Sequence, residues 1–216
     1  MKAKVILNLL IVGLFSSAVV AQSKSQVLLD KVSDQMAKHS NSKVEFTYKL
    51  DNTEADVHQQ TNGTVVIEGN KYKLNLFETT QINDGQKVYT IIPENEEVII
   101  EPFVEENTEI TPSKMLTFYK NGYSYIWDSL KTIGKKKVQY IKLIPDQISE
   151  ATEVLLGIDL GSNQIFEIVQ KTTEGSSITI RVNSFENDMT LPSNTFNFNG
   201  DQYEAQGFYI IDNSWK

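Results

Sequence analysis

The chain has 216 residues, no cysteine and a formal net charge of −8 at pH 7. Without cysteine it forms no disulfide and carries no lipid on a cysteine, so a hydrophobic core must hold the fold. With a single arginine, Arg181, and this acidity, it is a poor partner for phosphates. These features exclude nucleic-acid binding, argue against an anionic membrane surface, and favour a soluble monomer.

The N-terminus has the pattern of an export signal. Lys2 and Lys4 precede a largely apolar stretch, residues 5–20, and small residues follow at 19–21. The alternative, a membrane anchor, is disfavoured because a span needs about 20 apolar residues. We therefore expect residues 1–21 to be a signal peptide cleaved before Gln22, and residues 22–216 to form one domain.

The first half of that domain alternates clearly. Residues 23–40 carry apolar side chains at helical spacing, with Ser25 as a candidate cap, and predict an amphipathic helix. Residues 44–50 alternate strictly and predict a strand. After a polar turn at 52–61, residues 63–103 predict a meander of short antiparallel strands with a hairpin turn at Asn83-Asp84-Gly85.

The second half continues in the same way. Thr111-Pro112 predicts the start of a short helix that ends at Asn121-Gly122, and an aromatic-rich segment follows to Trp127. Further strands are predicted at 138–144, 153–160, 164–171, 176–185 and 195–198. The prediction is a mainly β (α+β) domain of about eleven antiparallel strands with two helices. Such a sheet either curls into a partly closed barrel over an apolar cavity or packs around a filled core.

No catalytic arrangement is evident. The two histidines, His39 and His58, have no nucleophile at a suitable spacing, and Gly122-Tyr123-Ser124 lacks the rest of a nucleophile elbow. The oxygen-rich turns at 51–56 and 159–163 do not match calcium-loop spacing. We expect no catalytic residue, metal or cofactor, and no enzyme activity.

The order of elements resembles the LolA family of periplasmic outer-membrane lipoprotein carriers. The resemblance extends over nearly the whole chain after the signal. The segments that carry it are Phe46-Thr47-Tyr48, Gly63–Ile67, Lys73–Leu76, Ile82–Tyr89, Ile92–Val98, Thr111–Leu116, Leu191–Phe198 and Gly207–Asp212.

The resemblance implies an incomplete antiparallel barrel whose open face is covered by helices. It also implies a periplasmic carrier that binds the acyl chains of lipoproteins and moves them from the inner to the outer membrane. The implied partners are acylated lipoproteins, an inner-membrane ABC-type lipoprotein-releasing complex and an outer-membrane acceptor. The alternatives on the same fold are a lipid or lipoprotein sensor and a carrier of another lipid.

The resemblance also implies which residues line the acyl cavity. They would be the inward-facing side chains of the sheet and three residues of the lid: Phe46, Tyr48, Leu50, Val65, Ile67, Tyr72, Leu74, Leu76, Tyr89, Ile91, Met115, Leu116 and Tyr119. Each could equally be ordinary core. Family members latch the lid with an Arg-Pro pair, where this chain reads Glu68–Lys71. Lys71 is the candidate replacement, although a lysine lacks the fixed fork of an arginine.

Overall fold

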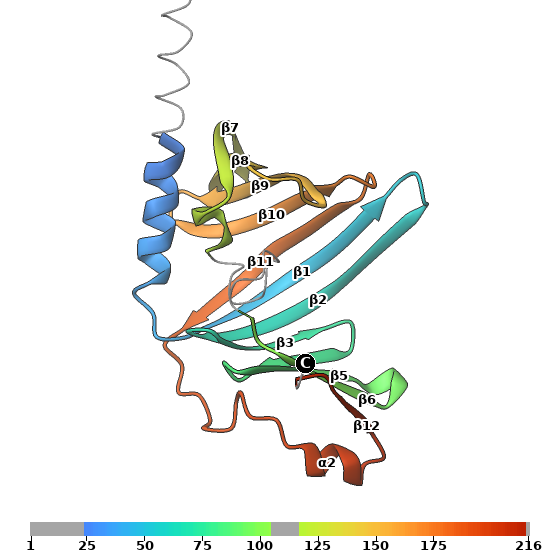
Figure 1. Ribbon diagram of the computed structural model, residues 1–216. Coiled ribbons are helices and arrows are strands. Elements are labelled where there is room, and N and C mark those ends of the chain that lie inside the picture. Colours follow the sequence, from blue (N-terminus) through green and yellow to red (C-terminus); the bar gives the residue numbers. More distant parts are fainter. Residues whose placement is uncertain (1–23, 105–116, 215–216) are drawn as a thin grey trace, which may run out of the picture.

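The computed structural model describes residues 24–104 and 117–214 and shows one large open sheet with a helix against it (Figure 1). Its 12 strands follow the order β12-β6-β5-β4-β3-β2-β1-β11-β10-β9-β8-β7. The strands are β1 (Ser42–Asn52), β2 (Val57–Glu68), β3 (Lys71–Leu76), β4 (Thr79–Asn83), β5 (Lys87–Ile92), β6 (Glu97–Pro102), β7 (Tyr123–Ile133), β8 (Lys136–Pro145), β9 (Ala151–Asp159), β10 (Gln164–Thr172), β11 (Ser177–Asn187) and β12 (Tyr209–Asp212). The helical elements are residues 24–36, η1 (Pro93–Asn95), η2 (Phe118–Lys120) and α2 (Gly200–Ala205).

Two antiparallel meanders make up the sheet. Strands β1 to β6 follow one another in sequence, as do β7 to β11, and the two series are joined where β1 pairs with β11. The last strand, β12, adds to β6 in parallel. The sheet does not close, so β7 and β12 are its two edge strands.

Hydrogen bonds reinforce one end of the β1–β11 pairing. Ser42 Oγ donates to Asn187 Oδ1 at 2.7 Å, and the Asn41 side-chain amide exchanges hydrogen bonds with the backbone of Met189. The Asp188 carboxylate accepts from the Ser40 backbone N–H at 2.8 Å. The turn that ends the N-terminal helix is therefore fixed to the end of β11.

The two faces of the sheet have different coverings. We call the face that packs on the N-terminal helix the inner face, and the opposite one the outer face. On the inner face Leu28, Leu29 and Val32 of the helix are buried against strands β1, β2 and β8 to β10. Because side chains alternate along a strand, Val44 and Phe46 share this face, whereas Lys43 and Glu45 point outward.

The outer face has a smaller core of its own. Ile82, Val98 and Ile100 from β4 and β6 are buried there, and the C-terminal segment that includes Phe196 and α2 covers them. Figure 1 shows this segment passing beneath β5 and β6 before the chain returns as β12. The β1–β6 meander therefore has apolar residues on both faces, because the N-terminal helix covers the inner face and the C-terminal segment covers the outer face.

Several sequence expectations were wrong in detail. Residues 52–61 belong mostly to β1 and β2, and only 53–56 form the turn between them. Strand β7 was not predicted, whereas 195–198 is not a strand. Ser25 lies within the helix and is buried, so it is not the cap. Of the second expected helix, residues 112–116 lie outside the described residues and 118–120 form the short η2.

Candidate lipid-binding face

The inner face gathers most of the residues expected to contact acyl chains. The β1, β2 and β3 side chains are in register: Val44 faces Val65, and Ile67 faces Tyr72. The expected residues that lie on this face are Phe46, Tyr48, Leu50, Val65, Ile67, Tyr72, Leu74 and Leu76. The structure therefore brings these eight together on one continuous surface.

Burial divides this surface into two parts. Phe46, Val65 and Tyr72 are fully buried in the core beneath the helix. Tyr48, Leu50, Leu74 and Leu76 lie farther from the helix along their strands and are only partly buried. Figure 1 shows that β1, β2 and β11 extend well beyond the part of the sheet that the N-terminal helix covers. The inner face is thus a dry core under the helix that continues into an apolar surface accessible to solvent.

Strand β11 contributes the rest of the solvent-accessible part of the inner face. Ile180 pairs with Tyr48, and Ile178 pairs with Leu50, so both β11 residues lie on the inner face. Ile180 and Val182 pack partly buried against the core. Sequence reasoning did not assign these residues to the site. Their alternation within 176–185 was a sufficient signal, but only the β1–β11 register places them next to Tyr48.

Tyr89 and Ile91 do not belong to this face, which corrects the expectation. Tyr89 pairs with Ile82 on the outer face, and its ring stacks on Phe198 with centroids 4.5 Å apart. Ile91 is buried in the same outer core. The reason is the register of the β4–β5 hairpin, which turns the odd-numbered residues of β5 outward.

The lid side of the site is only partly described. Met115 and Leu116 lie outside the described residues. Tyr119 of η2 is 1% exposed and belongs to the inner core. The Tyr125 hydroxyl donates a hydrogen bond of 2.6 Å to the Tyr119 carbonyl, which fixes η2 to strand β7. Tyr119 therefore closes part of the space between the helix and the sheet.

Lys71 lies on the opposite face of the sheet from Tyr119, the described part of the expected lid. Lys71 precedes Tyr72 on β3, so its side chain points to the outer face. There its methylenes lie beside Gly85 of the β4–β5 turn. Tyr119 lies on the inner face, so Lys71 does not contact it in this arrangement, and the latch stays a prediction for the rest of the lid.

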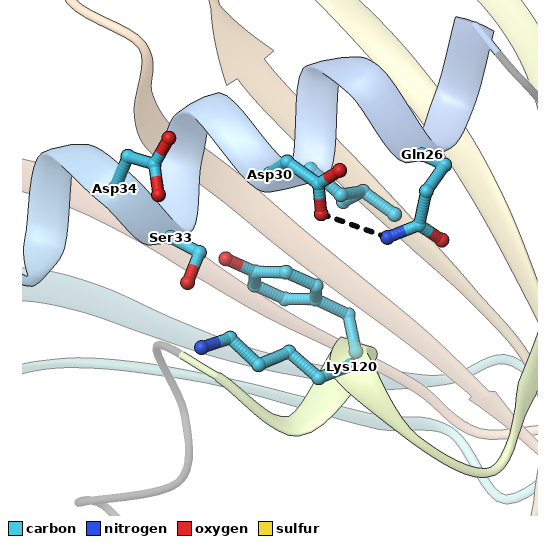
Figure 2. Close-up of a pocket in the computed structure, with 7 residues that line it drawn as sticks. Gln26, Asp30, Ser33, Asp34 and Lys120 are labelled. Atoms are coloured by element: carbon cyan, nitrogen blue, oxygen red, sulfur yellow. Dashed lines mark hydrogen bonds between the residues drawn. The ribbon is translucent and has the colours of Figure 1, made fainter.

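Polar side chains line the contact between the helix and η2. A groove of ≈ 300 Å³ lies here, lined by Gln26, Leu29, Asp30, Ser33, Asp34, Tyr119 and Lys120. Figure 2 shows the side chains of Ser33, Asp34 and Lys120 on its two sides. Gln26 donates a hydrogen bond to Asp30, whereas the buried Tyr119 hydroxyl has no hydrogen-bond partner among the described residues. Burial, together with the nearby negative charge of Asp30, raises the pKa of Tyr119 above its ordinary value. The helix is therefore apolar toward the sheet but loosely joined to η2.

A second groove of ≈ 200 Å³ runs along the C-terminal end of the same helix. Met36, Ile67 and Thr117 are among the residues that line it. The two grooves leave the helix attached mainly through Leu28, Leu29 and Val32. An element with few buried contacts is the kind that opens at low free-energy cost.

The chemistry of this face is that of binding. Its tyrosines are neutral at physiological pH because the ordinary pKa of a tyrosine is near 10, and burial raises the pKa of Tyr72 further, to about 12. In residues 24–104 and 117–214, no group of three His, Asp or Glu side chains is placed to hold a metal ion. Within the same ranges, every helix is too short or too polar to traverse a bilayer.

Comparison with solved structures finds similar chains among distant proteins. An uncharacterised conserved protein of Thermus thermophilus superposes with a TM-score of 0.58 at 8% identity, over 88% of this chain and 99% of that one. A LolA superfamily protein of Nitrosomonas europaea gives a TM-score of 0.42 at 10% identity, over 80% and 97%. The Mycobacterium tuberculosis lipoprotein LppX gives 0.46 at 11% identity, over 77% and 99%.

No curated protein matches this sequence. The sequence profile of the family described as "Outer membrane lipoprotein carrier protein LolA" matches residues 37–199, which run from the end of the N-terminal helix almost to α2. This match covers three quarters of the chain and confirms the resemblance in the order of elements. The fold is one that binds and carries lipids or lipoproteins, and the chain belongs to the LolA family.

Proposed function

We propose that this protein is a periplasmic carrier that binds the acyl chains of lipoproteins on its inner face and transfers them from the inner to the outer membrane. The observation that carries the proposal is the continuation of the inner core into an apolar surface that the helix leaves uncovered. Tyr48 and Leu50 of β1 and Ile180 of β11 form this surface, and Leu76 of β3 adds to it across β2. On β2 the neighbours of Tyr48 and Leu50 are the polar residues Thr61 and Gln59, which form its border. Membership of the LolA family supports the choice of cargo.

The energetics fit a carrier. Burying a methylene contributes about 0.8 kcal/mol, so one long acyl chain contributes on the order of 10 kcal/mol and needs a cover in water. The helix is attached by three buried apolar side chains beside two grooves. Exposing them costs about 1.5–3 kcal/mol each, so the gain from one acyl chain can offset the cost of moving the helix aside. A bound acyl chain would cover the exposed part of the inner face along β1 and β11. It would also displace the helix where it borders that surface.

The test is binding of a fluorescent triacylated peptide, compared with the same peptide without acyl chains. We expect only the acylated peptide to bind. Ile180→Gln on the inner face should weaken binding by about tenfold or more, because it places an amide in the apolar surface. Thr179→Gln is the matched control, since Thr179 is the next residue on β11 and points to the outer face. Equal affinity of the two variants would contradict the assignment of the inner face.

Native mass spectrometry of the protein isolated from the periplasm identifies the cargo. Bound acylated polypeptide supports the lipoprotein carrier. Bound phospholipid or glycolipid alone would move the assignment to a carrier of another lipid, or to a lipid sensor. Co-purification with an ABC-type complex would separate carrier from sensor, because a sensor needs a signalling partner instead.

A further inference from the structure

The β7–β8 hairpin is the one strongly basic part of an acidic chain. Residues 123–145 contain five lysines and one aspartate, a formal charge of +4. The whole chain carries −8, so the rest of it carries −12. The hairpin turns through Gly134-Lys135, and Gly134 has the positive φ of 59° that a glycine at the first position of a type II′ turn adopts. Lys135, Lys136 and Lys137 therefore lie at the tip of the hairpin.

Three of these lysines are available to an external anion. Lys136 pairs with Asp159 at 2.6 Å, and Lys142 pairs with Glu153 at 3.1 Å. The other three, Lys131, Lys135 and Lys137, are exposed. Within residues 24–104 and 117–214 none of the three lies within 4.0 Å of a carboxylate. The ammonium group of Lys131 lies over the Tyr140 ring, 4.8 Å from its centroid.

The same hairpin carries exposed apolar side chains on β7, the strand that contains Lys131 and leads into the lysine-rich turn. Ile126 is 49% exposed, Trp127 36% and Leu130 58%, although all three belong to a strand. A bulge between Trp127 and Leu130 keeps both on the inner-face side of β7. The Gln139 side-chain amide stabilises the bulge by donating hydrogen bonds to the Asp128 and Ser129 carbonyls. The structure thus holds the two apolar side chains at the rim of the sheet.

Strand β7 ends the sheet, so these side chains lie along its edge (Figure 1). Tryptophan and aliphatic side chains beside lysines are the residue types that settle at the boundary between lipid headgroups and acyl chains. Each lysine near an anionic lipid surface adds an attraction, and its long stem lets the charge reach the phosphates. The rest of the chain, with its formal charge of −12, is repelled by an anionic surface. The hairpin edge is therefore the part of the protein that such a surface attracts.

We propose that the β7–β8 hairpin docks the protein on an anionic lipid surface through Trp127, Leu130 and the three exposed lysines. This goes beyond the proposed carriage of cargo, because a protein with an empty inner face would dock as well. It also revises the expectation drawn from net charge alone, which overlooks the clustering of the lysines. Docking would bring the rim of the inner face next to the membrane from which an acyl chain leaves or to which it returns.

The test is co-sedimentation with vesicles of phosphatidylglycerol and phosphatidylcholine in equal parts, compared with pure phosphatidylcholine. We expect binding to the anionic vesicles alone, and loss of it when the ionic strength rises from about 0.01 M to about 0.15 M, which shortens the Debye length from about 30 Å to about 8 Å. The triple variant Lys131→Gln/Lys135→Gln/Lys137→Gln should bind about tenfold more weakly or worse.

The matched control is Lys38→Gln/Lys49→Gln/Lys71→Gln, which makes the same change in net charge at exposed lysines away from the β7 edge. Equal weakening by the two triple variants, or binding to neither kind of vesicle, would overturn the proposal. Ile180→Gln should still bind vesicles, which separates docking from cargo binding. If it loses vesicle binding, the inner face and not the hairpin makes the contact.

Tryptophan fluorescence locates the contact. In a Trp215→Phe background Trp127 is the only tryptophan, and its emission should shift to the blue on anionic vesicles. Vesicle binding without that shift would place the contact elsewhere and refute docking through β7. Binding of this edge to a protein partner while vesicles fail to bind would likewise refute the lipid assignment.

Discussion

The contact between Gly63 and Phe46 gives the sharpest test of how the inner core is built. These residues face each other across β1 and β2. A Cβ added at Gly63 would lie 2.4 Å from Phe46 Cζ and 2.7 Å from Cε2, whereas ordinary carbon contacts lie near 3.5–4.0 Å. The Phe46 ring is 3% exposed, so it must shift by about 1 Å within packed surroundings to admit a methyl group.

We therefore expect Gly63→Ala to destabilise the protein. Overpacking a core lowers the stability by about 1–3 kcal/mol, whereas replacing a glycine in a strand by alanine raises it by about 0.5–1 kcal/mol. The free energy of unfolding should thus fall by about 1–2 kcal/mol, measured by urea denaturation with an unchanged m-value. Gly200→Ala is the matched control, because there the new methyl group meets its neighbours at 3.5 Å and should be neutral or stabilising.

A double-mutant cycle separates this contact from a general effect on the strand. In a Phe46→Leu background the ring atoms that clash are gone, so Gly63→Ala should cost at least about 1 kcal/mol less than in the parent. The reasoning is refuted if Gly63→Ala is as stable as the parent. It is also refuted if the two substitutions are additive.

Three further results follow from polar contacts. On the outer face Arg181 Nε donates a hydrogen bond of 2.8 Å to the buried Glu167 carboxylate. Arg181→Met should therefore lower the free energy of unfolding, measured in urea, by about 1–3 kcal/mol. Unchanged stability would count against this contact. Burial raises the pKa of Tyr72 to about 12, so the native state keeps a proton that the unfolded chain loses near pH 10. Urea midpoints should therefore fall between pH 10 and 12, less so in Tyr72→Phe, and an equal fall in the variant would exclude Tyr72 as a source. The hydrogen bond from His39 and that from the Ser40 amide lower the pKa of Asp188 below 3.8, so its stabilisation is present above that pH and disappears as the pH falls through the lowered value. Asp188→Asn should thus lower the Tm at about pH 7 but not at about pH 2, and a constant difference would refute this linkage.

The sequence predicts the strands of this fold better than it predicts which elements pack on each face of the sheet. Strict alternation in 44–50 and 71–76 identifies β1 and β3 and the face on which Phe46 and Tyr72 lie. Alternation cannot say which side of the sheet a later hairpin presents. Tyr89, Ile91 and Tyr72 all belong to apolar alternating runs. The register of the β4–β5 hairpin puts Tyr89 and Ile91 on the outer face, where the C-terminal segment covers them.

Strand β7 was missed for a related reason. Its residues are mostly exposed on both faces, so Trp127, Asp128 and Leu130 do not show the two-residue period of a half-buried strand. The bulge at 128–129 breaks the period further. The second helix was expected from capping residues alone, and of its described part only η2 is helical. Tertiary pairing with β8, and not local propensity, sets this region.

The pairing of β1 with β11 has a consequence for the order of folding. Each of the two meanders can form from neighbours in sequence, but residues 42–51 must find residues 177–187, more than 125 residues later. Until then β1 and β11 both present unpaired edges, which are the parts of a sheet that attract foreign strands. Closing such long-range pairs is slow, so this step should limit the folding rate. A chain emerging N-terminus first exposes the β1 edge until almost all of it has arrived, and we expect it to need protection from aggregation during that interval.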